Sequence, residues 1–182
     1  MKAMETAAHP DDRRREIFLR LIAEYEGALR RLAGVYANAP QDREDIVQEI
    51  AVALWRAIPA FRGESSERTW LYRIAHNTAI TISGKLRRKA HSESSMDEGF
   101  EHPSDAEHED ERLIREQKRR WLFHAIRDLR VLDRQILSLH LEDLSHGEIG
   151  EVTGMSPGAI ATRLSRIRDR LTQGARQLEV RP

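Results

Sequence analysis

Residues 42–89 read DREDIVQEIAVALWRAIPAFRGESSERTWLYRIAHNTAITISGKLRRK, and they contain two helical patterns separated by a short polar loop. The first pattern gathers one set of apolar residues on one helical face: Ile46, Val47, Ile50, Leu54, Ala57 and Ile58. The second begins near Thr69, and its spacing predicts burial of Leu71, Ile74, Ala75, Thr78 and Ile82. We expect Tyr72, His76, Ser83 and Arg87 to point outward from this helix. The stretch therefore predicts an acidic helix face followed by an aromatic and basic one.

The same stretch resembles region 2 of bacterial sigma factors, and the small extracytoplasmic-function (ECF) class in particular. The resemblance rests on the runs Val47-Gln48-Glu49, Phe61-Arg62-Gly63 and TWLYRIA at 69–75. It implies a subunit of RNA polymerase that binds promoter DNA and has no enzymatic activity of its own, because the polymerase supplies the catalysis.

In sigma factors the acidic helix face docks on a basic coiled coil of the largest polymerase subunit. The resemblance thus implies that Asp45, Gln48 and Glu49 bind the core polymerase. The residues alone leave a simpler alternative open for Asp42, Glu44 and Asp45. Carboxylates in the first turns of a helix favour its positive dipole end, and the face would then only be solvated.

Holding a melted DNA strand requires aromatic or apolar walls, groups that read a base edge and cations for phosphates. The resemblance places such groups beside the minus-10 promoter element. The expected contacts are Phe61, Arg62, Ser65, Ser66, Tyr72, Arg73, His76 and Asn77. The alternative for Phe61 is a place in the core. Residues 80–84 depart from the family pattern, so we assign no DNA contact to them.

The C-terminal part predicts a helix-turn-helix. Ser145 and Glu148 form a capping box, Gly154 fits a tight turn, and Ser156 precedes Pro157 as the cap of a second helix. In that helix Ile160, Leu164, Ile167 and Leu171 form the inner stripe. We expect Ala159, Thr162, Arg163, Arg166 and Arg170 to face away.

Residues 143–166 resemble region 4 of the same sigma class, which implies recognition of the minus-35 element. The expected contacts are Ser156, Gly158, Ala159, Thr162, Arg163 and Arg166. We assign Arg163 to bases and Arg166 to phosphates. Two alternatives stay open: arginines that only solubilise the helix, and a dimeric operator-binding regulator. The regulator would leave residues 70–79 and the acidic face unexplained.

The charges of the chain are unevenly distributed. Lys plus Arg and Asp plus Glu number 30 each, yet residues 91–111 hold nine carboxylates and no Lys or Arg. We expect two helical domains at 13–89 and 113–176, joined by a flexible acidic linker at 90–112. The linker is either a spacer or a nucleic-acid mimic that crosses the polymerase. A long helix should run from Arg13 to Asn38, after twelve residues without regular structure, and another from Gln41 to Ile58.

Several classes of protein are excluded by composition. There is no cysteine, and no apolar run approaches the roughly twenty residues of a membrane span. We therefore expect a cytoplasmic all-α protein without membrane insertion, bound metal or cofactor. A hydrolase built on the eight histidines would need a nucleophile–base spacing that the sequence lacks. Core RNA polymerase and promoter DNA are the expected partners, and the resemblance also allows for an anti-sigma factor.

Overall fold

The computed structural model describes residues 10–92 and 109–179. These residues form seven α-helices and one 3-10 helix, with no strand among them. The helices are α1 (Pro10–Tyr36), α2 (Pro40–Ala57), η1 (Ile58–Ala60), α3 (Glu67–Ser92), α4 (Glu109–Arg127), α5 (Val131–Leu141), α6 (His146–Thr153) and α7 (Pro157–Glu179). The prediction of an all-α fold is confirmed.

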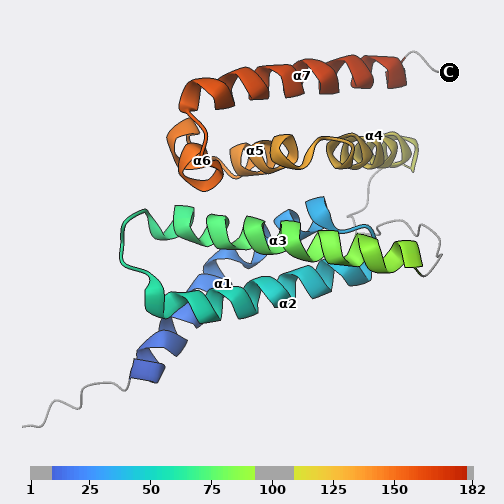
Figure 1. Ribbon diagram of the computed structural model, residues 1–182. Helices are drawn as coiled ribbons and strands as arrows, with labels where there is room; N and C mark the ends of the chain where they lie inside the picture. Colours follow the sequence, from blue (N-terminus) through green and yellow to red (C-terminus); the bar gives the residue numbers. More distant parts are fainter. Residues whose placement is uncertain (1–9, 93–108, 180–182) are drawn as a thin grey trace, which may run out of the picture.

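Helices α1, α2 and α3 pack into one bundle (Figure 1). Helix α2 packs against both α1 and α3 because Ile46, Ile50 and Leu54, each four residues apart, are fully buried along one face. The start of α2 is capped by Asp42, whose carboxylate accepts the backbone N–H groups of Asn38 and Ala39 at 3.1 and 3.3 Å.

Helices α4 to α7 form the second half, in which α7 runs back along α4 and α5 (Figure 1). The capping box of α6 is confirmed: Glu148 N–H donates to Ser145 Oγ at 3.3 Å, and Ser145 N–H donates to the Glu148 carboxylate at 2.8 Å. The turn after α6 is also confirmed, because Gly154 adopts a left-handed φ of 75°.

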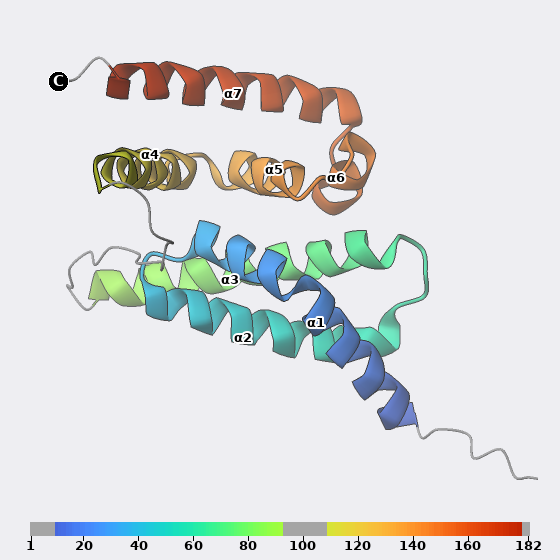
Figure 2. The same ribbon diagram turned by 180° about the vertical axis from the view of Figure 1, so that it is seen from behind.

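The two halves pack directly against each other. Figures 1 and 2, which view the molecule from opposite sides, show α4, α5 and α6 against α1 and α3, with α7 on the outer side. One cluster of buried apolar side chains includes residues of both halves, from Leu21 and Leu71 to Ile136 and Leu164. This arrangement decides which of the expected site residues reach the surface.

Helix boundaries differ from the sequence expectation in three places. Helix α1 begins at Pro10, where Asp11 and Asp12 in its first turn favour the helix dipole. Helix α3 continues to Ser92 and α4 begins at Glu109, so both ends of the expected linker are helical. The rest of that linker, 93–108, lies outside the described residues, as does the expectation about residues 1–9. Within the described ranges, no helix is both long enough and apolar enough to cross a bilayer.

Candidate polymerase and nucleic-acid interfaces

The acidic face of α2 points away from the core. Gln48 and Glu49 are exposed and Asp45 is partly exposed, opposite the fully buried Ile50. Val52 continues this face at helical spacing and is 42% exposed. The sequence analysis missed Val52 because an apolar residue is normally assigned to the core. The position of Val52, three residues after Glu49, places it on the same helical face and could have identified it.

Two neighbouring carboxylates serve the fold instead. Asp42 caps α2, as described above, and Glu44 accepts a hydrogen bond from Arg30 of α1 at 2.9 Å. Glu44 is itself exposed but pairs with Arg30, so the rest of the acidic face consists of Asp45, Gln48 and Glu49, with Val52 beside them.

The loop before α3 is held by contacts among the residues expected to bind DNA. Phe61 packs on Trp70 with ring centroids 4.8 Å apart. Ser66 Oγ accepts the Thr69 N–H at 3.1 Å, which caps α3, and the Arg73 guanidinium donates to Ser65 Oγ at 3.2 Å. Arg62 is exposed, next to Gly63 with a left-handed φ of 74°. The structure thus brings Phe61, Ser65, Ser66 and Arg73 into one small region.

A groove of about 1030 Å³ lies beside this loop. Phe61 and Trp70 line one wall together with Ile58 and Pro59, and α1 contributes Arg13 and Arg20. Arg20 is engaged by Glu67 through two hydrogen bonds of 2.8 and 2.7 Å. The groove combines aromatic walls with three arginines, Arg13, Arg14 and Arg20, and three carboxylates, Asp11, Glu16 and Glu67. The sequence analysis missed it because α1 and the loop are about fifty residues apart.

The expected outward orientation of three α3 residues was wrong. Tyr72, His76 and Ser83 are only 2%, 1% and 7% exposed. Tyr72 packs edge-on against Tyr25, and His76 Nδ1 lies 3.1 Å from the hydroxyl of Tyr36. Helix α3 is covered on a second side by α5 and α6, so it buries a broader surface than its apolar stripe indicates. Asn77, in contrast, is exposed.

Burial shifts the ionisation of these side chains. It lowers the pKa of His76 to about 3, so the imidazole is neutral at pH 7. Burial, followed by the negative charge of Glu142, raises the pKa of Tyr72 well above its usual range. Neither side chain carries charge at neutral pH in this arrangement.

The helix-turn-helix has the expected inner stripe, with Ile160, Leu164 and Ile167 buried. Ser156 Oγ accepts the Ala159 N–H at 3.3 Å and caps α7. On the opposite face Gly158, Thr162 and Arg166 are exposed at four-residue intervals, whereas Ala159 is partly buried. This exposed face can approach a DNA groove, because small side chains stand at its start.

The outward orientation expected for Arg163 was also wrong. Its guanidinium donates to the Asp133 carboxylate of α5 at 2.6 Å, and the two side chains are 36% and 20% exposed. The pair joins α7 to α5. Arg166, about one turn further along α7, is exposed, as are Arg168 and Arg170.

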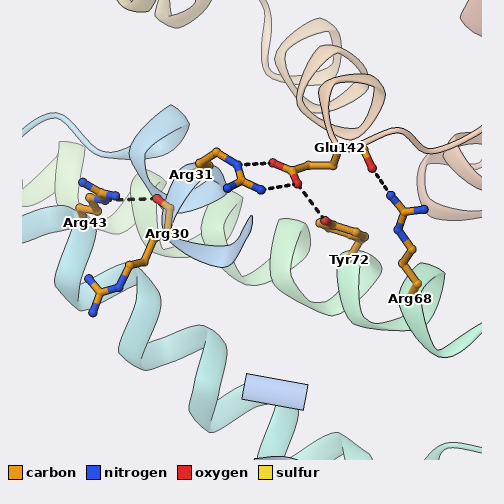
Figure 3. A network of polar contacts seen from close by, with 6 residues as sticks. All are labelled: Arg30, Arg31, Arg43, Arg68, Tyr72 and Glu142. Carbon is orange, nitrogen blue, oxygen red and sulfur yellow. Dashed lines mark hydrogen bonds and ion pairs between the residues drawn. The ribbon is translucent and has the colours of Figure 1, made fainter. Parts of the chain in front are cut away.

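A polar network joins the two halves around Glu142 (Figure 3). The Glu142 carboxylate accepts two hydrogen bonds of 2.7 Å from the Arg31 guanidinium and one of 3.3 Å from the Tyr72 hydroxyl. The Arg68 guanidinium donates to the backbone carbonyl of Glu142. Hydrogen bonding to Glu142 is the main cause that raises the pKa of Arg31. No local sequence signal pointed to this network, because Arg31 and Glu142 are 111 residues apart.

Comparisons with known proteins match both halves of the chain. Residues 21–91 match the family described as Sigma-70 region 2, and residues 119–171 match Sigma-70, region 4. The ECF RNA polymerase sigma-E factor of Haemophilus influenzae is 30% identical over 162 residues, covering 85% of each chain. The factor of the same name from Escherichia coli K12 is 29% identical over 156 residues, covering 82% of this chain and 81% of its own.

Two solved structures share the fold. One is the sigma factor RpoE in complex with the anti-sigma factor NepR from Bartonella quintana, with a TM-score of 0.70 and 22% identity over 92% of this chain and 99% of that one. The other is CnrH in complex with the cytosolic domain of CnrY, with a TM-score of 0.64 and 22% identity over 92% and 91%. With matches to both regions and a relative 30% identical over most of its length, the chain belongs to the sigma-70 family, in the extracytoplasmic-function class of RNA polymerase sigma factors.

Proposed function

We propose that this sigma factor directs core RNA polymerase to promoters by reading a minus-35 element with α6–α7 and a minus-10 element with α3 and its preceding loop. The observation that carries the proposal is the exposed face of α7, where Gly158, Thr162 and Arg166 follow one another at helical spacing. A helix of this kind, set by a glycine turn against a second helix, enters the major groove of duplex DNA. Ser156 at its start is exposed and adds a hydroxyl to this surface.

Arg166 takes the role of contacting DNA in this proposal, and Arg163 positions α7 through Asp133. Ala159 lies at the edge of the exposed face. A bidentate contact from an arginine to guanine discriminates against other bases by about 1–3 kcal/mol.

Strand capture is assigned to the loop and the adjoining surface of α3. Phe61 and Trp70, whose rings pack at a tilt of 43°, offer aromatic walls to the groove beside the loop, and an unpaired base stacks favourably on an aromatic side chain. Further hydrogen-bonding groups on the loop and on α3 come from Arg62, Ser65, Ser66, Arg73 and Asn77. Tyr72 is buried while the two halves are packed together, so it can contact DNA only after they separate. His76 supports the core.

Core polymerase binding is assigned to Asp45, Gln48, Glu49 and Val52. Acidic groups around an exposed apolar residue suit a basic partner surface, since charges steer the encounter and the apolar residue adds buried area. An anti-sigma factor is a further proposed partner. The support is that two structures of similar fold are complexes, one with an anti-sigma factor and one with the cytosolic domain of CnrY. Acting with RNA polymerase would place the protein in the cytoplasm.

Transcription by purified core polymerase, with and without this protein, on a library of promoter sequences tests the proposal. We expect new start sites that share one motif near minus 35 and one near minus 10. A chain that binds duplex operators tightly by itself, and leaves the start sites unchanged, is instead a free-standing regulator.

A further inference from the structure

Three side chains of the α1–α3 half contact Glu142 of the other half, two of them at its carboxylate and one at its backbone carbonyl (Figure 3). Arg31 holds Glu142 through a fork of two 2.7 Å hydrogen bonds, and the Tyr72 hydroxyl donates to the same carboxylate at 3.3 Å. Arg68 reaches the backbone carbonyl of the same residue. A planar guanidinium fork fits a carboxylate and a phosphate equally well. The three side chains thus form an anion cradle, defined here as Arg31, Arg68 and Tyr72.

The anion cradle has room for a group larger than a carboxylate. A cavity of about 480 Å³ lies beside it, lined by all three of its residues. The Arg31 side chain is 64% exposed, whereas the Glu142 side chain is only 15% exposed. The cradle is therefore open to solvent at Arg31, whereas Arg68 is partly buried and Tyr72 is buried.

Other charges at the cavity do not neutralise the cradle once the halves separate. Glu24 and Asp143 also line it. Glu24 lies 3.6 Å from Arg20 in an ion pair on its own helix, and Asp143 follows Glu142 into the second half. Separation would leave Arg31 and Arg68 together on the α1–α3 half without the anion that they now hold.

Separation of the halves follows from the proposed function, on which this inference rests. Minus-35 and minus-10 elements lie about 25 base pairs apart, or about 85 Å at 3.4 Å per base pair. In the packed structure α3 and α6 lie in direct contact, so one chain cannot occupy both elements in this arrangement. Tyr72 reaches the surface of the α1–α3 half only when Glu142 leaves.

We propose that Arg31, Arg68 and Tyr72 bind a backbone phosphate of the minus-10 DNA strand, and that Glu142 occupies this site as an internal anion while the halves are packed together. Arg68 and Tyr72 lie on α3, the helix that also carries Arg73 and Asn77, and Arg31 reaches the site from α1. Glu142 and DNA compete for the same guanidinium groups, so the packed chain masks its own DNA site. Separating the halves exchanges the carboxylate for the phosphate.

The first experiment measures whether Glu142 keeps the halves together. The chain contains no cysteine, so exposed Ala23 of α1 and Gln173 of α7 can be replaced by Cys and spin-labelled. We expect one narrow distance distribution in the otherwise unchanged chain. Glu142→Arg places a cation against Arg31 and Arg68, and it should shift the distribution to longer distances. Glu151→Arg, an exposed charge reversal in the same half, should not.

The second experiment measures the site itself with a fluorescent single-stranded dT12 oligonucleotide and the full chain. Glu142→Ala should bind it more tightly than the unchanged chain does. Adding Arg31→Ala and Arg68→Ala should reverse the gain and flatten the slope of log affinity against log salt by about 0.7, the value for one phosphate of a single strand. Arg30→Ala, which removes a neighbouring partly exposed arginine of α1, should leave the slope of Glu142→Ala unchanged.

An equal slope with and without Arg31 and Arg68 would overturn the phosphate site, and Glu142 would then be only a contact between the halves. Unchanged distances between the two spin labels in the Glu142→Arg variant would overturn the proposal that Glu142 keeps the halves together and masks the site. Both readouts use the chain without polymerase or a promoter. They can therefore fail while transcription still depends on this protein, and the proposed function is judged separately.

Discussion

The hydroxyl of Tyr36 on α1 lies 3.1 Å from Nδ1 of His76 on α3, in the core of the first half. Burial lowers the pKa of His76 to about 3 and raises the pKa of Tyr36 above its usual range. Both groups are therefore neutral at pH 7, and the tautomer of the imidazole sets which of the two donates in this hydrogen bond. His76 is a structural histidine of the bundle.

This buried histidine predicts a loss of stability in mild acid. Below its ordinary pKa of about 6.5, His76 takes up a proton in the unfolded chain, whereas the folded chain resists protonation down to about pH 3. The stabilisation is complete above pH 6.5 and falls as the pH drops. Between pH 7 and pH 5 the free energy of unfolding should fall by about 2 kcal/mol from this group. Urea unfolding at the two pH values measures it.

Two substitutions distinguish the contribution of His76 to this pH dependence from that of other titrating groups. His76→Gln retains an acceptor for Tyr36 without a proton to gain, and it should remove most of the difference between pH 7 and pH 5. His124→Gln replaces an exposed histidine of α4 and should retain the difference. If His76→Gln is as sensitive to acid as the unchanged protein, other groups cause the loss.

The two arginines of α7 should differ in what they do. Arg163→Ala breaks the 2.6 Å ion pair with Asp133 and should cost about 1 kcal/mol of stability. A double-mutant cycle with Asp133→Ala isolates the pair. Arg166→Ala should leave stability unchanged, yet weaken holoenzyme binding to a minus-35 duplex and flatten the salt slope by about 0.9. The reverse pattern would return DNA contact to Arg163.

The sequence predicted the features that depend on neighbouring residues. The capping box of Ser145 and Glu148, the turn at Gly154 and the buried stripes of α2 and α7 are all as expected. Each depends on residues within one or two helical turns, so spacing and side-chain chemistry suffice to predict it.

The features that the sequence could not predict depend on contacts between residues far apart in the chain. Tyr72 and His76 are polar, so spacing alone places them in solvent. They are buried because Glu142 and Tyr36, 70 and 40 residues away, provide hydrogen bonds. Arg163 likewise turns inward to Asp133, 30 residues earlier. A helical wheel has no information on such partners, and it assigns every polar residue to the surface.

Gly150, in α6 before the turn of the helix-turn-helix, should not tolerate a side chain. A Cβ at Gly150 would lie 2.6 Å from the backbone oxygen of Met155, which cannot move without opening the turn. Gly150→Ala should therefore cost about 1–3 kcal/mol. At Gly158 a Cβ meets open space, and Ala there should be neutral or stabilise α7 by up to about 1 kcal/mol. Thermal unfolding compares the two; equal losses would contradict the close approach.

The acidic face of α2 should be needed for polymerase binding and dispensable for folding. Asp45→Arg with Glu49→Arg reverses two carboxylates that face away from the buried Ile46 and Ile50. We expect loss of co-purification with core polymerase and unchanged helical circular dichroism. Asp12→Arg with Glu16→Arg makes the same reversal, also four residues apart and exposed, on α1. The α1 variant should still bind the polymerase. Polymerase binding that survives the α2 reversal would contradict the assignment.

Asn77 should matter for opening the promoter more than for finding it. Its side chain is exposed on α3, and its backbone carbonyl accepts a hydrogen bond from Thr81 at 2.8 Å, so truncating the side chain leaves the helix intact. Asn77→Ala should lose open complexes on duplex DNA while holoenzyme binding at the minus-35 element persists. The defect should shrink on a template with a mismatched bubble and unchanged minus-10 bases, because unpairing then costs little. Thr81→Ala, exposed one turn further along α3, is the matched control and should behave normally on both templates. Equal defects of Asn77→Ala on duplex and bubble templates would mean that Asn77 reads a base and has no part in strand separation.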